Sequence, residues 1–139
     1  MTRSQIKKKL DTVFSQYVRI HGSNEMGWGE CITCGRLKFW KEAQCGHFIT
    51  RAKMSTRWLY EPDIGRVNVG FQCAKCNLFG QGQQYVFGRK LDELYGEGTA
   101  EKILYLSNQT KKWSVYELED LHHYYKKKVE ELKESRGLE

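Results

Sequence analysis

The chain has 139 residues, of which 40% are hydrophobic, with one proline and a formal net charge of +6. This length suits one folded domain with a modest core, to which a bound metal would add considerable stability. No stretch approaches the roughly 18 consecutive apolar residues of a membrane span, and the N-terminal "MTRSQIKKKL" lacks the apolar segment of a secretory signal. These features argue against a membrane protein and predict an intracellular, cytoplasmic one.

Basic residues are concentrated in the first part of the chain. Residues 1–60 contain 11 Lys and Arg against 4 Asp and Glu, whereas residues 61–139 contain 12 against 13. Such an asymmetry suggests a surface that faces a polyanion. A solvated basic surface without any partner is the alternative explanation.

The first predicted element is an amphipathic helix over residues 4–21, followed by Gly22 where a helix should stop. Lys7, Lys8 and Lys9 are expected on its exposed side. Its apolar residues recur at helical spacing and are expected to pack in the core: Ile6, Leu10, Val13, Phe14, Tyr17 and Val18.

Residues 22–30 are rich in glycine and predict a loop. The helical period then disappears between residues 31 and 82. Short runs such as "LKFW", "CGHFI" and "RVNVGF" indicate strands there, and "EPDIG" (61–65) indicates a turn between two of them.

Three helices are expected in the remaining chain, over residues 83–95, over about 99–106, and from Ser114 onward. Ser114 and Glu117 form the sequence pattern of a capping box at the start of the last helix. The apolar stripe of that helix is expected to form either core or a dimer contact. The whole layout predicts a single α+β domain over residues 1–139.

The five cysteines form two C-x-x-C pairs, Cys31/Cys34 and Cys73/Cys76, with Cys45 standing apart. In an intracellular chain such pairs indicate a metal site rather than disulfides. Four thiolates are enough to close a tetrahedral structural zinc site. The alternative is a site in which Cys45 or His47 replaces one of the four cysteines.

A basic segment follows the first cysteine pair. Residues 43–60 contain three basic side chains and no acidic one, with His47 near the start of the segment. A lone histidine is usually a packed side chain with satisfied hydrogen bonds. Here, however, Asn68 is expected on a second strand, and Asn77 directly follows the fourth cysteine, so His47 becomes a candidate for chemistry.

The ordered motifs "CITCG", "GHF" and "RVNVGFQCAKCN", followed by a helix with Tyr85, Leu91 and Gly96, resemble the HNH or His-Me finger nucleases. Their layout is similar to that of phage endonuclease VII. The chain looks closest to the NinG (Rap) family of lambdoid phage recombination nucleases, over about residues 28–135. This resemblance implies a zinc-stabilised ββα-metal core over residues 28–96, embedded between an N-terminal helix (1–22) and C-terminal helices (97–139).

The resemblance also implies a role for each motif residue. His47 would be the general base that removes a proton from the attacking water. Asn68 would fix the hairpin or orient His47. Asn77 would bind a catalytic Mg²⁺ or Mn²⁺ through its side-chain oxygen, separately from the structural Zn²⁺ of the cysteines.

The substrate implied by the resemblance is DNA, in particular a branched recombination intermediate such as a Holliday junction. Arg51, and less directly Lys53, Arg57 and Arg66, would grip its phosphates. A two-fold substrate favours a homodimer. A phage-encoded protein of this kind would work in the cytoplasm of the host cell.

The sequence departs from the family pattern just before the histidine. Relatives usually carry an acidic residue there that helps to hold the catalytic metal, whereas this chain has Gln44, Cys45 and Gly46. Either another carboxylate serves, or metal binding is weak, or activity is impaired. The candidate carboxylates are Glu42, Glu61 and Asp63.

Two other classes of function remain open. A zinc-dependent DNA-binding module without catalysis would explain the cysteines and the charge, but it would not need His47, Asn68 and Asn77. A redox or zinc-transfer protein would need an accessible cysteine of low pKa, and it would leave the basic segment unexplained.

Overall fold

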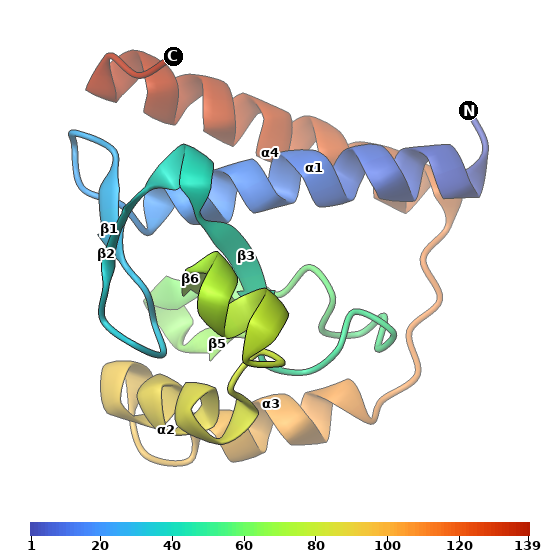
Figure 1. The fold of residues 1–139 in the computed structure, drawn as a ribbon. Coiled ribbons are helices and arrows are strands. Elements are labelled where there is room, and N and C mark those ends of the chain that lie inside the picture. Colours follow the sequence, from blue (N-terminus) through green and yellow to red (C-terminus); the bar gives the residue numbers. More distant parts are fainter.

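The computed structural model describes residues 1–139 (Figure 1). The helices are α1 (Arg3–His21), α2 (Gln84–Tyr95), α3 (Thr99–Ser107) and α4 (Val115–Arg136). The strands are β1 (Trp28–Glu30), β2 (Leu37–Phe39), β3 (Gln44–His47), β4 (Tyr60–Glu61), β5 (Arg66–Val67) and β6 (Val69–Gln72). Two 3₁₀ turns lie at Trp40–Glu42 and Pro62–Ile64, and a π-helical turn at Lys75–Phe79.

The elements form three layers. The helices α1 and α4 pack side by side on one side of the molecule, α2 and α3 pack together on the opposite side, and the short strands lie between them (Figure 1). This is the predicted mixture of helices with a small β element. None of the helices combines the length and the apolar character needed to cross a membrane.

Capping boxes set the starts of the two long helices. The Ser114 hydroxyl accepts a hydrogen bond from the Glu117 N–H at 3.0 Å, and the Glu117 carboxylate accepts one from the Ser114 N–H at 3.0 Å. Thr2 and Gln5 form the same reciprocal pair at the start of α1. Each cap contributes about 1 kcal/mol by satisfying backbone donors that the first turn leaves free. The capping box predicted at Ser114 is confirmed.

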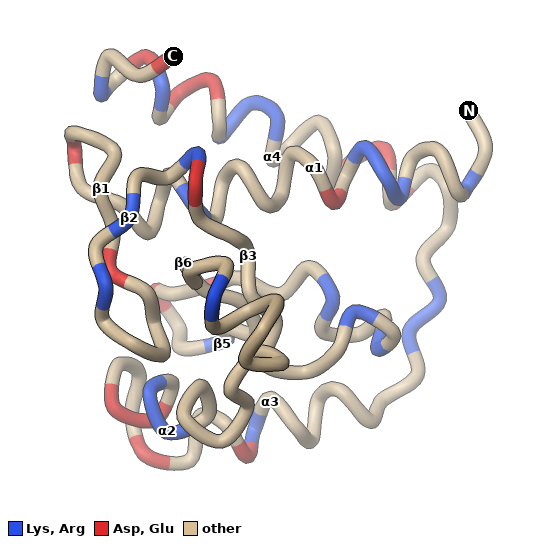
Figure 2. Tube along the Cα trace, in the orientation of Figure 1, with Lys and Arg blue, Asp and Glu red and all other residues tan.

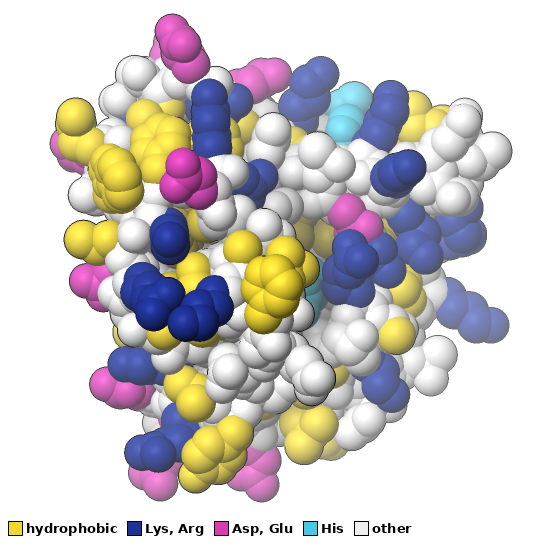
Figure 3. All heavy atoms as spheres, viewed as in Figure 1, with side chains coloured by type: hydrophobic (Ala, Val, Ile, Leu, Met, Phe, Trp, Pro, Cys, Tyr) yellow, Lys and Arg dark blue, Asp and Glu magenta, His cyan; other side chains and the backbone are white.

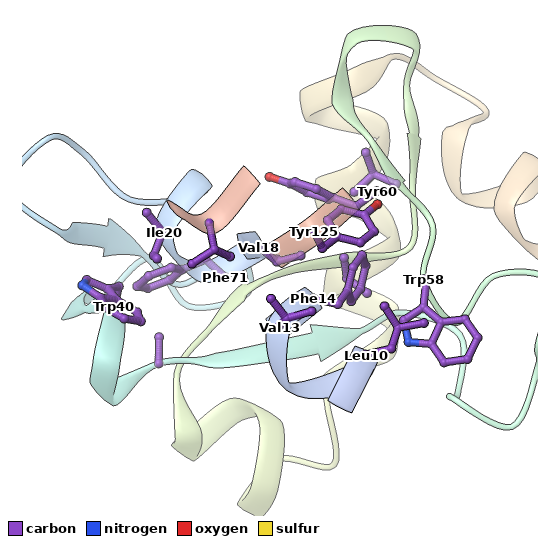
Figure 4. Packing of buried hydrophobic residues seen from close by; sticks show 14 of the residues in the cluster. Leu10, Val13, Phe14, Val18, Ile20, Trp40, Trp58, Tyr60, Phe71 and Tyr125 are labelled. Carbon is purple, nitrogen blue, oxygen red and sulfur yellow. The ribbon is translucent and has the colours of Figure 1, made fainter. Parts of the chain in front are cut away.

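The hydrophobic core lies between α1, α4 and the strands (Figure 4). The ring of Phe14 in α1 meets the ring of Tyr125 in α4 edge to face, with centroids 5.0 Å apart. Phe71 of β6 packs into the same cluster. The apolar stripe of the last helix therefore belongs to the core of this chain, which decides between the two roles expected for it.

The strands form three antiparallel pairs: β1 with β2, β3 with β6, and β4 with β5. The expected strand over residues 66–71 is interrupted at Asn68, where the chain changes partner. The Asn68 N–H donates to the Leu59 carbonyl at 3.0 Å, and its own carbonyl accepts from the Phe48 N–H at 2.7 Å. Asn68 thus joins the β4–β5 pair to the β3–β6 pair.

The helix expected over residues 83–95 is confirmed as α2, and the chain between the second cysteine pair and this helix forms a turn of its own. Asn77 lies inside the π-helical turn, and α2 begins only at Gln84. The backbone has positive φ angles of 55° at Gln81, 85° at Gly82 and 53° at Gln83. Because a right-handed helix requires negative φ, this run separates the turn from α2.

Truncation of Phe14 should show how much α1 and α4 depend on each other. Phe14 is 1% exposed, so we expect Phe14→Ala to lower the free energy of unfolding by about 3–5 kcal/mol through lost burial and a cavity. Chemical denaturation monitored by circular dichroism measures this loss. The matched control is Tyr116→Ala on α4, where the ring is 73% exposed and the loss should stay below about 1 kcal/mol. Equal losses in the two variants would contradict this packing.

Candidate active site and metal centre

The four paired cysteines come together at one point. The Sγ atoms of Cys31, Cys34, Cys73 and Cys76 all lie within 4.8 Å of one another, and those of Cys34 and Cys73 are 3.7 Å apart. Four sulfurs bound tetrahedrally to zinc at roughly 2.3 Å stand about 3.8 Å from each other. The cluster therefore fits a structural Zn²⁺, and neither His47 nor Cys45 belongs to it.

The surroundings of Cys31 favour a thiolate. Burial opposes ionisation of Cys31, but hydrogen bonds from the Cys73 backbone N–H and the Thr33 hydroxyl outweigh it and lower the pKa of this thiol to about 6. A thiolate at neutral pH is the form that binds zinc. The redox alternative needs the low-pKa thiol to be accessible, whereas Cys31 is only 2% exposed. The exposed Cys34 has a raised pKa, mainly through desolvation.

A polar cavity of about 480 Å³ lies beside the zinc cluster, between α1, β3 and the segment 77–84. His47, Asn77 and Arg51 line it, together with Asp11 of α1 and Gln84 at the start of α2. The structure thus brings together three of the residues predicted for the site. Asn68, Lys53 and Arg66 lie outside this cavity.

His47 ends β3 and is held by one hydrogen bond. Its Nε2 lies 2.9 Å from the backbone carbonyl oxygen of Arg57. Because a carbonyl can only accept, Nε2 carries the proton, and Nδ1 keeps a free lone pair without a protein partner. Desolvation lowers the pKa of His47 below its usual 6.5, although the hydrogen bond to Arg57 opposes this shift. The imidazole is therefore neutral at neutral pH.

Asn68 is completely buried, and its side chain binds the loop that follows His47. Its Oδ1 accepts from the Ile49 N–H at 2.8 Å, and its Nδ2 donates to the carbonyls of Ile49 and Thr56, both at 3.0 Å. The amide therefore fixes the loop backbone and makes no bond to the His47 ring. Of the two roles expected for Asn68, this geometry is that of a residue that fixes the hairpin.

Asn77 is positioned by the backbone of the zinc knuckle. Its N–H donates to the Cys73 carbonyl at 3.0 Å, and the Cys76 carbonyl accepts from the Gly82 N–H at 2.9 Å. At the far end of the segment, Gln84 Nε2 donates to the His47 and Phe48 carbonyls at 3.1 and 2.7 Å. The segment with Asn77 is thus tied to the zinc cluster at one end and to β3 at the other.

Position 46, directly before His47, has no room for a side chain. A Cβ atom on Gly46 would lie 2.1 Å from Oε1 of the buried Gln72. Gln72 cannot easily move, because its Nε2 donates to Thr33 in the zinc knuckle and to the Gly82 carbonyl. A side chain at position 46 would therefore displace a residue that links the zinc knuckle to the loop after Asn77.

The carboxylate that does reach the cavity is Asp11 of α1, whereas Glu42, Glu61 and Asp63 do not line it. Asp11 accepts hydrogen bonds from Arg57 at 3.1 and 2.5 Å and from the Trp58 indole at 2.9 Å. Sequence reasoning missed this residue because 36 positions separate it from His47. The one available signal was that Asp11 is the only acidic residue of the predicted N-terminal helix.

The cavity offers oxygen ligands to a hard cation such as Mg²⁺ or Mn²⁺, including the Asn77 and Gln84 amides and the Asp11 carboxylate. Arg57 already engages that carboxylate. Apart from the four cysteines, no group of three or more His, Cys, Asp and Glu side chains converges. The four cysteines therefore provide a complete set of ligands for zinc, whereas the side chains around Asn77 provide only part of a set for a second cation.

The predicted phosphate-binding residues have different surroundings. Arg51 is at the cavity rim with 60% of its side chain exposed, and it lies 3.8 Å from Asp11. The Arg57 side chain is 14% exposed and paired with Asp11. Lys53 is exposed on the loop after β3, and Arg66 is exposed on β5. Arg51 is therefore the basic side chain free to reach a ligand in the cavity.

Removal of a zinc ligand should have a larger effect than removal of the fifth cysteine. We expect wild type to bind one zinc per chain, and Cys73→Ala to lose it and melt about 10 °C lower or more, because metal binding contributes directly to folding. Cys45→Ala is the matched control, since it removes a thiol outside the cluster and should retain the metal. Elemental analysis and thermal melting measure both. Zinc loss in Cys45→Ala but not in Cys73→Ala would overturn the assignment.

A match to a known protein family supports the resemblance seen in the sequence motifs. A family model described as "Bacteriophage Lambda NinG protein" matches residues 1–135. No curated protein and no solved structure matches the chain. The family match includes α1, so it contains Asp11 as well as the cysteines, His47 and Asn77. The chain belongs to the NinG family of bacteriophage lambda.

Proposed function

We propose that this NinG-family protein is a metal-dependent endonuclease that cleaves phosphodiester bonds in DNA. The observation that carries the proposal is the state of His47: a neutral imidazole with Nδ1 free, beside Asn77 in a polar cavity. A protein that only binds DNA has no need of such a base. The resemblance of the motifs to HNH nucleases supports the same chemistry.

The proposed reaction begins with a water molecule in the cavity. His47 Nδ1 accepts a proton from this water as its oxygen forms a bond to the scissile phosphorus. The bond from phosphorus to the leaving oxygen then breaks, and this oxygen takes a proton from solvent water, so one strand is cut. The Arg57 carbonyl stabilises the imidazolium that forms, because it accepts a hydrogen bond from Nε2 throughout the step.

Asn77 is the residue proposed to hold a catalytic Mg²⁺ or Mn²⁺. Such an ion, when bound, supplies several kcal/mol of stabilisation to the charge on the phosphorane and the leaving oxygen. The contribution of the chain is to present the Asn77 amide rigidly, through the backbone bonds to the zinc knuckle. Arg51 at the rim is proposed to bind the scissile or a neighbouring phosphate.

The other three basic residues predicted to contact phosphates lie at different distances from the cavity. Lys53 lies on the exposed loop next to Arg51, which supports a contact outside the cavity. Arg57 is proposed to hold the site together rather than to bind a phosphate, because its guanidinium is paired with Asp11 and its carbonyl holds His47. Arg66 lies on β5, away from the cavity, so it would reach only a second part of a large substrate.

Branched recombination intermediates are the proposed substrate, on the basis of the NinG family and its association with phage recombination. A junction with two-fold symmetry presents two equivalent strands, and a homodimer would place one cavity at each of them. Light scattering of the protein alone and with a four-way junction tests this assembly.

A non-catalytic, zinc-dependent DNA-binding protein is the second candidate. The observations that favour it are the engaged state of Asp11 and the steric exclusion of a carboxylate at Gly46. Both leave the proposed catalytic cation with few strong ligands. A cleavage assay separates the two candidates directly.

Cleavage of a labelled four-way junction, compared with a linear duplex of the same sequence, tests the proposed base. We expect wild type to cut with Mg²⁺ or Mn²⁺, and His47→Ala to lose about 10²–10⁴-fold in rate while remaining folded and zinc-loaded. Metal-free conditions should be prepared with chelator-treated buffers, since EDTA in the assay would also extract zinc. The matched control is His123→Ala, which alters an exposed histidine on α4.

Binding without cutting by wild type under every divalent metal would favour the second candidate. Zinc loss in His47→Ala would instead make His47 a structural residue. Asn77→Ala should lower the rate and raise the metal concentration needed for half-maximal activity. Asn77→Asp tests the metal role further, because a carboxylate should restore or strengthen cation binding.

The pH dependence of cleavage follows from the lowered pKa of His47. The base works only when neutral, so the rate should be constant through neutral pH and fall as the pH drops through a pKa below 6.5. Single-turnover rates between about pH 5 and pH 8 measure this profile. The fall should have the slope of a single protonation. A rate that keeps rising well above neutral pH would be inconsistent with His47 as the base.

A further inference from the structure

A basic groove crosses the N-terminal half of α1 next to the cavity that contains His47. Its wall consists of Arg3, Ser4, Lys7, Lys8, Asp11, Arg51 and Arg57, with no hydrophobic residue. Asp11 and Arg51 also line the His47 cavity, so the two hollows adjoin at these residues. We propose that this basic groove binds the phosphate backbone of a duplex DNA arm next to the scissile phosphate. The inference rests on the proposed endonuclease and names the surface that would hold its substrate.

The spacing of the residues explains why several basic side chains meet in the groove. Arg3, Lys7 and Asp11 are four positions apart, and Ser4 and Lys8 lie beside them, so all five share one face of α1. Lys9 does not line the groove. The sequence predicted all three lysines on the exposed side of this helix. In the structure Lys7 and Lys8 line the groove, whereas Lys9 lies on another face of the helix.

Asp11 is the only acidic residue in the groove, and it is already neutralised. Its carboxylate is paired with Arg57 at 2.5 Å and lies 3.8 Å from Arg51. An unpaired carboxylate here would repel a phosphate, whereas this one adds little net charge. The excess positive charge therefore remains with Arg3, Lys7, Lys8 and Arg51.

The length of the groove suits a DNA backbone. Arg3 and Asp11 are eight residues apart, which corresponds to about 12 Å along the helix axis. The charges of one strand of duplex DNA rise by roughly 3.4 Å each along the duplex axis, and because the strand winds around that axis, a groove of this length spans about two phosphates or more. Contacts of this kind position a duplex without reading its sequence.

The groove continues past the start of α1. Arg3 and Lys7 also line a neighbouring hollow that contains Lys111, Lys112 and Trp113. Arg3 donates a hydrogen bond to the Trp113 carbonyl, which holds the chain before α4 against the start of α1. Figure 2 shows Lys and Arg of the first half of α1, of the loop after β3 and of the chain before α4 on one side of the molecule. Figure 3 shows basic side chains gathered on that side.

A matched pair of double variants tests the groove by fluorescence anisotropy with a labelled duplex and zinc-loaded protein, without added divalent metal. Lys7→Glu with Lys8→Glu reverses two charges in the groove. Lys9→Glu with Lys102→Glu reverses two exposed charges outside it, on another face of α1 and on α3. Because the total charge is the same in both, a difference between them reports on position alone.

We expect the groove variant to bind duplex at least about tenfold more weakly than the control variant at moderate salt. The slope of log affinity against log salt should decrease in magnitude by about 2 in the groove variant, since each lost phosphate contact removes roughly 0.9. Lys7→Gln with Lys8→Gln should show a smaller loss of the same kind. Circular dichroism and zinc content confirm that each variant is folded.

If the two double variants weaken duplex binding equally, the proposed role of the groove is wrong, because total charge alone would then explain the binding. Tighter binding of a single strand of the same length would overturn the assignment to a duplex arm. The proposed endonuclease activity is tested separately. If wild type binds duplex through the groove but cuts no DNA, the proposed catalysis is wrong and the proposed role of the groove still holds. If wild type cuts DNA but the two double variants bind duplex equally, the proposed role of the groove is wrong and the proposed catalysis still holds.

Discussion

The four-cysteine cluster is the constraint on which the rest of the candidate site depends. It joins the turn after β1 to the turn after β6, two segments whose cysteine pairs are separated by 38 residues. The carbonyls of Cys73 and Cys76 then hold the π-helical turn and the loop after it, and Asn77 lies between them. A short chain with small two-stranded sheets has few other means of holding such a turn still, and a bound metal supplies this rigidity directly.

The second support of the site is the contact between α1 and the loop that follows β3. Asp11 binds both Arg57 and Trp58, and the Arg57 carbonyl holds His47. The N-terminal helix therefore orients the imidazole through one intermediate residue. The same helix places its basic face at the entrance of the cavity. The inclusion of α1 in the NinG family match is consistent with a helix that belongs to the site rather than to a separate appendage.

Parts of the site follow from local rules and could be predicted, and other parts could not. The paired cysteines and the cap at Ser114 depend on short spacings that a sequence displays, whereas the joint site of His47 and Asn77 was implied only by the resemblance to HNH nucleases. The π-helical turn around Asn77 and the positive φ angles of Gln81 and Gln83 after it were not predictable, because π-helices are rare and non-glycine residues rarely adopt a positive φ. The role of Asn68 as an anchor of the loop also needed the fold, since its partners lie 12 and 19 residues away.

The helices, the cysteine pairs and the asymmetry of charge can be predicted from local patterns, because periodicity, capping and ligand spacing act over a few residues. The folded structure was needed to find which carboxylate reaches the cavity, why position 46 is glycine, and which lysines of α1 line the groove. These depend on side chains distant in sequence that packing brings together: Asp11 is paired with Arg57, Gln72 fills the space at Gly46, and Lys7 lines the same hollow as Arg51. Such contacts are set by the shape of the whole core and not by any local pattern.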